Sequence, residues 1–169
     1  RGVSIDLGFA DLTLTDGNQV SIVDVPGHER FISNMLAGVA SIDLAIMVVA
    51  ADEGIMPQTQ EHLDILELLN VNSGLVAITK KDLVDSEWLG LVVEEVESFI
   101  ADTTLRNSAI LTVSAVTGDG VQEVAAHISS SLHDSVAKRD LGRPRLPIDR
   151  VFTMPGFGAV VTGTLIDGF

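Results

Sequence analysis

The chain has 169 residues, enough for one domain with a proper core and the start of a second. Hydrophobic residues make up 46% of it and cysteine is absent, which argues against disorder and excludes disulfides, thiolate metal sites and cysteine nucleophiles. The net charge of −14 argues against a surface that binds nucleic acid over its whole extent.

No segment has the pattern of a membrane span or a secretion signal. The longest purely apolar run, residues 44–51, is far shorter than the about 20 residues that a membrane-spanning helix needs. The first residues also lack a signal-peptide pattern. We therefore expect a cytoplasmic protein with no membrane contact.

Short β-branched runs alternate with amphipathic segments, which is typical of a mostly parallel, doubly wound α/β sheet covered by helices on both faces. The run at 44–50 is apolar at every position, so we expect a strand buried on both faces. Asp16-Gly17-Asn18 predicts a turn that joins the first two strands as an antiparallel hairpin. Strands are expected at residues 4–14, 20–25, 44–50, 74–78 and 109–113, and helices at 29–40, 59–70, 87–102 and 121–134.

The composition changes after residue 137. Five of the ten basic residues lie between Lys138 and Arg150, and glycine and proline occur among them. A solvated linker and a local RNA contact are both open readings of this cluster. Strand-like segments follow at 146–153 and 158–166, too few for an independent domain. The expected organisation is a domain at 1–137, a linker at 138–145 and the start of an all-β domain at 146–169.

The first segment that suggests chemistry is Asp24-Val25-Pro26-Gly27-His28, between a predicted strand and a predicted helix. A carboxylate at a strand end can hold Mg²⁺ through water, and a glycine lets a backbone N–H approach a phosphate closely. An ordinary strand–turn–helix junction is the alternative reading.

A second segment, Thr79-Lys80-Lys81-Asp82, follows the predicted strand at 74–78. A carboxylate there can accept hydrogen bonds from the N1–H and exocyclic amine of guanine, and a lysine stem can lie across the base. A solvated strand end is the alternative reading. Against it, Lys80 and Lys81 are two of only three lysines in the chain.

Ser114-Ala115, after the strand at 109–113, offers small residues whose backbone can approach the edge of a base. All three segments follow strands, and open α/β sheets bind ligands at the carboxyl ends of their strands.

In order and spacing, the three segments resemble the GTP-binding motifs of translational GTPases. The run Asp6-Leu7-Gly8-Phe9, Thr79 in place of the usual asparagine, and the stretches 51–62, 146–152 and 156–164 are similar to the selenocysteine-specific elongation factors. The resemblance covers nearly the whole chain. It implies a GTPase-type sheet followed by the first strands of a β-barrel domain.

The resemblance also implies roles for individual residues. GTP or GDP would be bound by the three segments, with Mg²⁺ held by Asp24 through water and by the hydroxyl of Ser4, where the family usually has threonine. Gly27 would sense the γ-phosphate and His28 would orient the attacking water. Asp149 and Arg150 match positions that line the pocket for the selenocysteinyl group.

One departure from the family is the lack of any G-x-x-x-x-G-K-[ST] sequence, which in the family supplies the phosphate loop. The family's fold places the strand before that loop between the strands at 20–25 and 44–50. We therefore expect these 169 residues by themselves to be unstable or inactive, because unpaired strand edges and a weak phosphate site would result.

By resemblance, the expected function is GTP hydrolysis coupled to delivery of selenocysteinyl-tRNA to the ribosome. Recognition of a messenger-RNA element or adaptor would belong to later domains. Two alternatives remain open at this point: another tRNA-delivering or initiation GTPase, and a non-catalytic chain that uses the GTPase scaffold to bind a partner. Retention of Asp24, His28 and Asp82 argues against the second of these.

Overall fold

The computed structural model describes residues 8–14, 17, 19–27, 42–134, 142–146, 148–163 and 165. The chain divides into two compact units. One unit contains residues 14–18 and 43–135, and the other contains residues 1–13, 19–42 and 136–169. Among the described residues, no helix is both long and apolar enough to cross a membrane.

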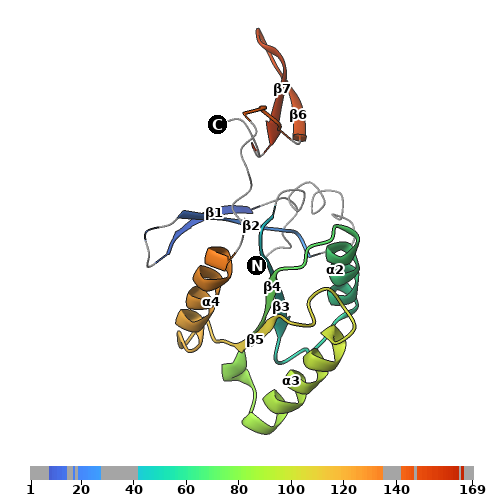
Figure 1. The fold of residues 1–169 in the computed structure, drawn as a ribbon, viewed down its shortest axis with the longest axis vertical. Helices are drawn as coiled ribbons and strands as arrows, with labels where there is room; N and C mark the ends of the chain where they lie inside the picture. Colours follow the sequence, from blue (N-terminus) through green and yellow to red (C-terminus); the bar gives the residue numbers. More distant parts are fainter. Residues whose placement is uncertain are drawn as a thin grey trace. The chain divides into compact units, whose positions relative to one another are not determined.

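The unit of residues 43–135 is built on a three-stranded parallel sheet in the order β3-β4-β5 (Figure 1). The strands are β3 (Ala45–Ala50), β4 (Gly74–Thr79) and β5 (Ala109–Thr112). Ala45 pairs with Gly74, and Leu75 pairs with Ala109. The predicted positions of these strands are confirmed to within one residue at each end, and parallel pairing brings their carboxyl ends to one edge of the sheet.

Helices lie on both sides of this sheet: α2 and α3 on one side and α4 on the other (Figure 1). Their bounds are Pro57–Leu68 for α2, Ser86–Ile100 for α3 and Val121–Asp134 for α4, with a short 3₁₀ helix, η2, at Lys81–Leu83. The prediction for α4 is confirmed at both ends. The predicted helix at 29–40 lies outside the described residues.

The helices begin where their local chemistry allows. Helix α2 starts two residues earlier than predicted because Pro57 occupies its first turn, where a missing N–H costs nothing. The Thr59 hydroxyl accepts a hydrogen bond from the Met56 N–H at 3.2 Å. Helix α3 starts after Asp85, whose carboxylate accepts a hydrogen bond from the Trp88 N–H at 2.8 Å.

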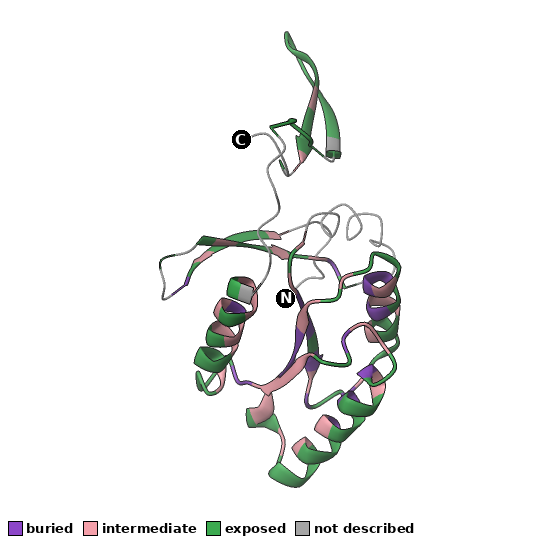
Figure 2. Ribbon diagram, in the orientation of Figure 1, coloured by how far each residue is buried: buried purple, intermediate pink, exposed green. Residues whose placement is uncertain are grey.

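The core lies between the sheet and its helices (Figure 2). It includes Leu63 of α2 and Val96 of α3. Four consecutive residues of β4 are buried, from Leu75 to Ile78, as expected of the central strand.

The prediction that the strand at 44–50 is buried on both faces was wrong. In β3, burial alternates: Met47 is buried, but the side chains of Ile46 and Val48 are 39% and 59% exposed. Side chains of successive strand residues point to opposite faces, and only one face of β3 is well covered. Within the described part of the chain, β3 is hydrogen-bonded to β4 alone and lies at an edge of the sheet. The strand buried on both faces is β4, which lies between β3 and β5.

The other unit contains two separate antiparallel hairpins. In the first, β1 (Gly8–Thr13) pairs with β2 (Gln19–Asp24), which confirms the predicted hairpin. Gly17, in the connection, has a φ of 87°, a conformation that glycine adopts without strain, and its N–H donates to the Leu14 carbonyl at 3.0 Å.

In the second hairpin, β6 (Ile148–Met154) pairs with β7 (Gly158–Gly163), close to the predicted strands. The register shifts between Ile148 and Arg150, which marks a β-bulge or irregularity at Asp149.

Candidate nucleotide-binding site

The carboxyl ends of β4 and β5 bring two of the predicted motifs together. The Val113 N–H donates to the Ile78 carbonyl at 2.8 Å, which extends the sheet pairing beyond the last residue of β5. The Lys81 N–H then donates to the Val113 carbonyl at 3.2 Å. These bonds place the segment 79–82 beside the segment 114–115 at one edge of the sheet.

Thr79, at the end of β4, is tied to β3 on its other side. Its hydroxyl donates to the Val49 carbonyl at 3.3 Å, and its own carbonyl accepts from the Ala51 N–H at 2.8 Å. Thr79 is therefore a structural link at the start of the motif. A threonine hydroxyl can make this link in place of an asparagine amide because the acceptor is a backbone carbonyl.

Lys80 has an unusual backbone conformation for a residue other than glycine, with φ 58° and ψ 29° in the left-handed region. This turn ends the strand and begins η2. Such a conformation costs about 1–2 kcal/mol for an L-residue. It persists where surrounding contacts hold it in place.

The side chain of Lys80 supplies such contacts. Its Nζ lies 2.9 Å from Asp52 Oδ1 and 3.3 Å from Glu53 Oε1, both in the turn that follows β3. The hydrogen bond with Asp52 is the main cause that raises the pKa of Lys80 above 10.5. The ammonium group is thus held by two carboxylates of that turn.

The adjacent Lys81 turns the opposite way. Its Nζ lies 2.6 Å from Asp119 Oδ2, in the loop that follows β5. Asp82, the residue predicted to select guanine, is exposed within η2. Its carboxylate can therefore meet a ligand at this edge without first breaking an internal ion pair, since Asp82 has none among the described residues.

Ser114 is buried and organises the loop that follows β5. Its hydroxyl oxygen accepts hydrogen bonds from the N–H groups of Val116 and Thr117 at 3.2 and 3.1 Å. Its own N–H donates to the Asp119 carbonyl at 2.9 Å. Ala115, the next residue, is exposed. The loop is therefore closed on itself and presents the backbone around Ala115 to solvent.

The remaining predicted residues belong to the other unit or lie outside the description. Asp24 ends β2 and is exposed opposite Gly8, where an added Cβ would stand 3.6 Å from Asp24 Oδ2. Val25 is half-buried, Pro26 is buried and Gly27 is exposed. Ser4 and His28 lie outside the described residues. Asp149 and Arg150 lie in β6, and only their backbone is described.

Three acidic residues of this site were missed by reasoning from the sequence: Asp52, Glu53 and Asp119. Each lies in a segment that follows a strand flanking β4, and each forms an ion pair with a lysine of the motif. The sequence did hold a signal: acidic residues follow both β3 and β5, the two strands that flank the strand before Lys80 and Lys81. Which lysine pairs with which carboxylate could not be assigned without the left-handed backbone at Lys80, which directs the Lys80 and Lys81 side chains to different neighbours.

Comparison with known proteins identifies the class to which this fold belongs. The family model described as "Elongation factor Tu GTP binding domain" matches residues 1–134, and the chain belongs to this family. The predicted GTPase-type fold is thereby confirmed.

Within that class, the chain is similar to selenocysteine-specific elongation factors, as its sequence predicts. It is 52% identical over 168 residues to that of Desulfomicrobium baculatum, covering 99% of this chain and 26% of the relative. It is 41% identical over 168 residues to that of Escherichia coli, covering 99% of this chain and 27% of the relative. The chain therefore spans about a quarter of the length of these curated relatives.

A solved structure agrees with this relationship. Translation elongation factor SelB from Methanococcus maripaludis, in complex with the GTP analogue GppNHp, matches with a TM-score of 0.88 and 36% identity. The match covers 98% of this chain and 36% of the SelB chain. A bacterial selenocysteine-specific elongation factor matches with a TM-score of 0.86 and 37% identity, covering 98% of this chain and 28% of that one.

Proposed function

We propose that this chain is the guanine-nucleotide-binding part of a translational GTPase that delivers selenocysteinyl-tRNA to the ribosome. The observation that carries the proposal is the convergence of the two base-recognition segments, joined by the bond from Lys81 N–H to the Val113 carbonyl. Family membership and the 52% identity to a selenocysteine-specific elongation factor support it.

In the proposed complex, the Asp82 carboxylate accepts hydrogen bonds from the N1–H and the exocyclic amine of guanine. Adenine lacks that pair of donors, so Asp82 selects the base. The stem of Lys80 lies across the base while Asp52 and Glu53 hold its ammonium group. The backbone around Ser114 and Ala115 contacts the edge of the base.

On the resemblance to the family, we assign phosphate binding to the segment 24–28. Asp24 suits Mg²⁺ held through water, because its carboxylate offers hard oxygen atoms and is exposed at a strand end. No group of three or more acidic or histidine side chains gathers in the described part of the chain, so the nucleotide phosphates and water would supply most ligands. Ser4 is the proposed direct protein ligand, through its hydroxyl. Bound Mg²⁺ would neutralise phosphate charge.

This chain's own residues perform the remaining steps. The Gly27 N–H binds the γ-phosphate, and the side chain of His28 orients the attacking water in line with it. We expect the 169 residues alone to turn GTP over poorly, because they contain no G-x-x-x-x-G-K-[ST] sequence to bind the β-phosphate.

The delivery role concerns the second proposed domain, which begins at residue 146 after the linker 138–145. There Asp149 and Arg150 would line the pocket for the selenocysteinyl group, and a guanidinium suits an ionised selenol. Contacts with the ribosome and with a messenger-RNA element or adaptor are proposed for parts of the whole protein beyond this chain.

The catalytic part of the proposal is tested by single-turnover GTP hydrolysis in an extended chain. We define the extended chain as these 169 residues preceded by a phosphate-loop segment from the Desulfomicrobium baculatum relative. His28→Ala should slow hydrolysis on the order of 10²-fold while GTP binds as before. Hydrolysis at the same rate in the variant would remove His28 from the mechanism.

A further inference from the structure

An ion pair that no proposed role uses joins the two base-recognition loops. Lys81 Nζ lies 2.6 Å from Asp119 Oδ2. The Lys81 side chain is only 20% exposed, whereas that of Asp119 is 67% exposed. Lys81 belongs to η2, after β4, and Asp119 belongs to the loop after β5. The pair therefore links the two loops just past the ends of β4 and β5.

The backbone at Lys80 directs this arrangement. Because the backbone of Lys80 is in the left-handed region, the side chains of Lys80 and Lys81 point to opposite sides of β4. Lys80 pairs with Asp52, after β3, and Lys81 pairs with Asp119, after β5. Since β4 lies between β3 and β5, the two lysines together link all three strand ends.

Asp119 is in turn connected to Ser114 by hydrogen bonds within the loop after β5. The Asp119 carbonyl accepts from the Ser114 N–H at 2.9 Å, and the Asp119 N–H donates to the Thr117 hydroxyl at 3.3 Å. The Gly118 N–H donates to the Ser114 carbonyl at 2.9 Å. A displacement of Asp119 therefore moves the backbone at Ser114.

We propose that Lys81 and Asp119 are a positioning pair that sets the distance between the two loops that hold the guanine base. This inference rests on the proposed function of the site. In the proposed binding mode Lys81 and Asp119 pair with each other and not with the base. The pair then governs how long a guanine nucleotide stays bound, while Asp82 governs which base is chosen.

The test uses the extended chain with Asp119→Asn, Lys81→Met, the double variant and the reversed pair Lys81→Asp with Asp119→Lys. Each single variant should release labelled GDP roughly two- to fivefold faster, the range expected for a partly exposed ion pair. The double variant should be no worse than either single one, because both remove the same interaction. The reversed pair should recover most of the loss, which separates an ion pair from a packing effect.

A matched control is Glu123→Gln. Glu123 is exposed in the first turn of α4 and forms no ion pair among the described residues. This variant should release GDP at the rate of the unchanged protein. The preference for GDP over XDP should also stay the same in every Lys81 and Asp119 variant, because Asp82 is intact.

Hydrogen exchange of the Lys81 and Ser114 amides gives a readout that does not depend on nucleotide. Both amides should exchange faster in Asp119→Asn, because the pair holds the Lys81 N–H against the Val113 carbonyl and the Asp119 carbonyl against the Ser114 N–H. Unchanged exchange and unchanged GDP release in both single variants would overturn the inference while leaving guanine selection intact. Equal binding of GDP and ADP by the extended chain would instead overturn the proposed function, and faster exchange in Asp119→Asn would still support the positioning pair.

Discussion

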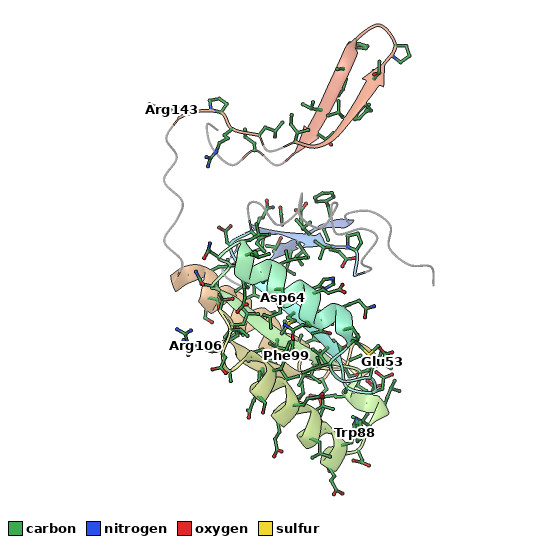
Figure 3. All side chains as sticks on the ribbon, turned by 90° about the vertical axis from the view of Figure 1, so that its right-hand side faces the viewer. Glu53, Asp64, Trp88, Phe99, Arg106 and Arg143 are labelled. Atoms are coloured by element: carbon green, nitrogen blue, oxygen red, sulfur yellow. The ribbon has the colours of Figure 1, made fainter. Side chains whose placement is uncertain are left out.

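Trp88 donates its indole N–H to the carbonyl oxygen of Ala51 at 2.9 Å. This bond joins the first turn of α3 to the segment that follows β3, where Ala51 is completely buried. Figure 3 labels Trp88 and Glu53, which lie near each other at one end of this unit. The turn after β3 also contains Asp52 and Glu53, so Trp88 supports the segment that anchors Lys80.

Trp88→Phe should lower the free energy of unfolding by about 1–2 kcal/mol, because it leaves the buried Ala51 carbonyl without this donor. Urea unfolding of the extended chain, followed by far-UV circular dichroism, measures the change. Leu91→Ala is the control, since Leu91 is 56% exposed on the same helix and should cost less than about 0.5 kcal/mol. Equal losses in the two variants would mean that the indole bond contributes nothing specific.

Gly120→Ala should destabilise the loop after β5 by about 3 kcal/mol or more. Gly120 has a φ of 79°, and an added Cβ would come within 2.2 Å of the Thr112 carbonyl oxygen. The backbone conformation and the clash both oppose the methyl group. Gly118→Ala provides a matched control, because Gly118 has a φ of 80° with no atom near its added Cβ.

Gly118→Ala should therefore lose only the conformational part, about 1–2 kcal/mol. Urea unfolding of both variants separates the two costs. If the two substitutions cost the same, the close approach of Gly120 to Thr112 does not constrain the loop.

Asp82→Asn should move base preference from guanine toward xanthine, because an amide can donate to the carbonyl that xanthine carries in place of the exocyclic amine. Competition between GDP and XDP for the extended chain measures the change. Asp85→Asn, three residues later, is the control. Asparagine caps a helix about as well as aspartate, so α3 should stay intact and guanine preference unchanged. An unaltered preference in Asp82→Asn would show that another group reads the base.

His62 gives the chain a predictable response to acid. Burial in α2 lowers the pKa of His62 below 6.5, and the charge of Glu61 partly opposes this. The unfolded chain then binds the proton more tightly, so this contribution to stability is complete above about pH 6.5 and is lost as pH falls through the folded-state pKa.

Between pH 7.5 and 5.5, His62→Gln should therefore lose less stability than the unchanged protein in urea unfolding. Glu61→Gln should lose more, because it removes the charge that favours protonated His62. Identical pH profiles for the three proteins would contradict this assignment.

Much of the fold was accessible from the sequence. Apolar β-branched runs located β3, β4 and β5, and Gly17 located the first hairpin, because local conformational preference decides these features. Helix α4 was predicted at both ends. The error at β3 arose because an apolar run has no alternation to show which face is covered, and coverage depends on packing with distant segments.

The site was partly predictable for the same reason. Its two base-recognition segments were found because binding a guanine base needs particular residue types just past strand ends. The carboxylates that anchor Lys80 and Lys81 were not found, since they are 28 and 38 positions away along the chain. Their pairing follows from strand order and from one left-handed residue, which local sequence does not specify.

The central claim is that this edge of the sheet binds guanine nucleotides selectively. The most direct measurement is a titration with labelled GDP, GTP and ADP in the presence of Mg²⁺, first with the 169-residue chain and then with the extended chain. We predict that the extended chain binds both guanine nucleotides roughly 10²-fold or more tightly than ADP. The reason is that guanine, unlike adenine, offers two hydrogen-bond donors to the Asp82 carboxylate. Equal affinity for ADP, or no nucleotide binding by the extended chain, would contradict the account.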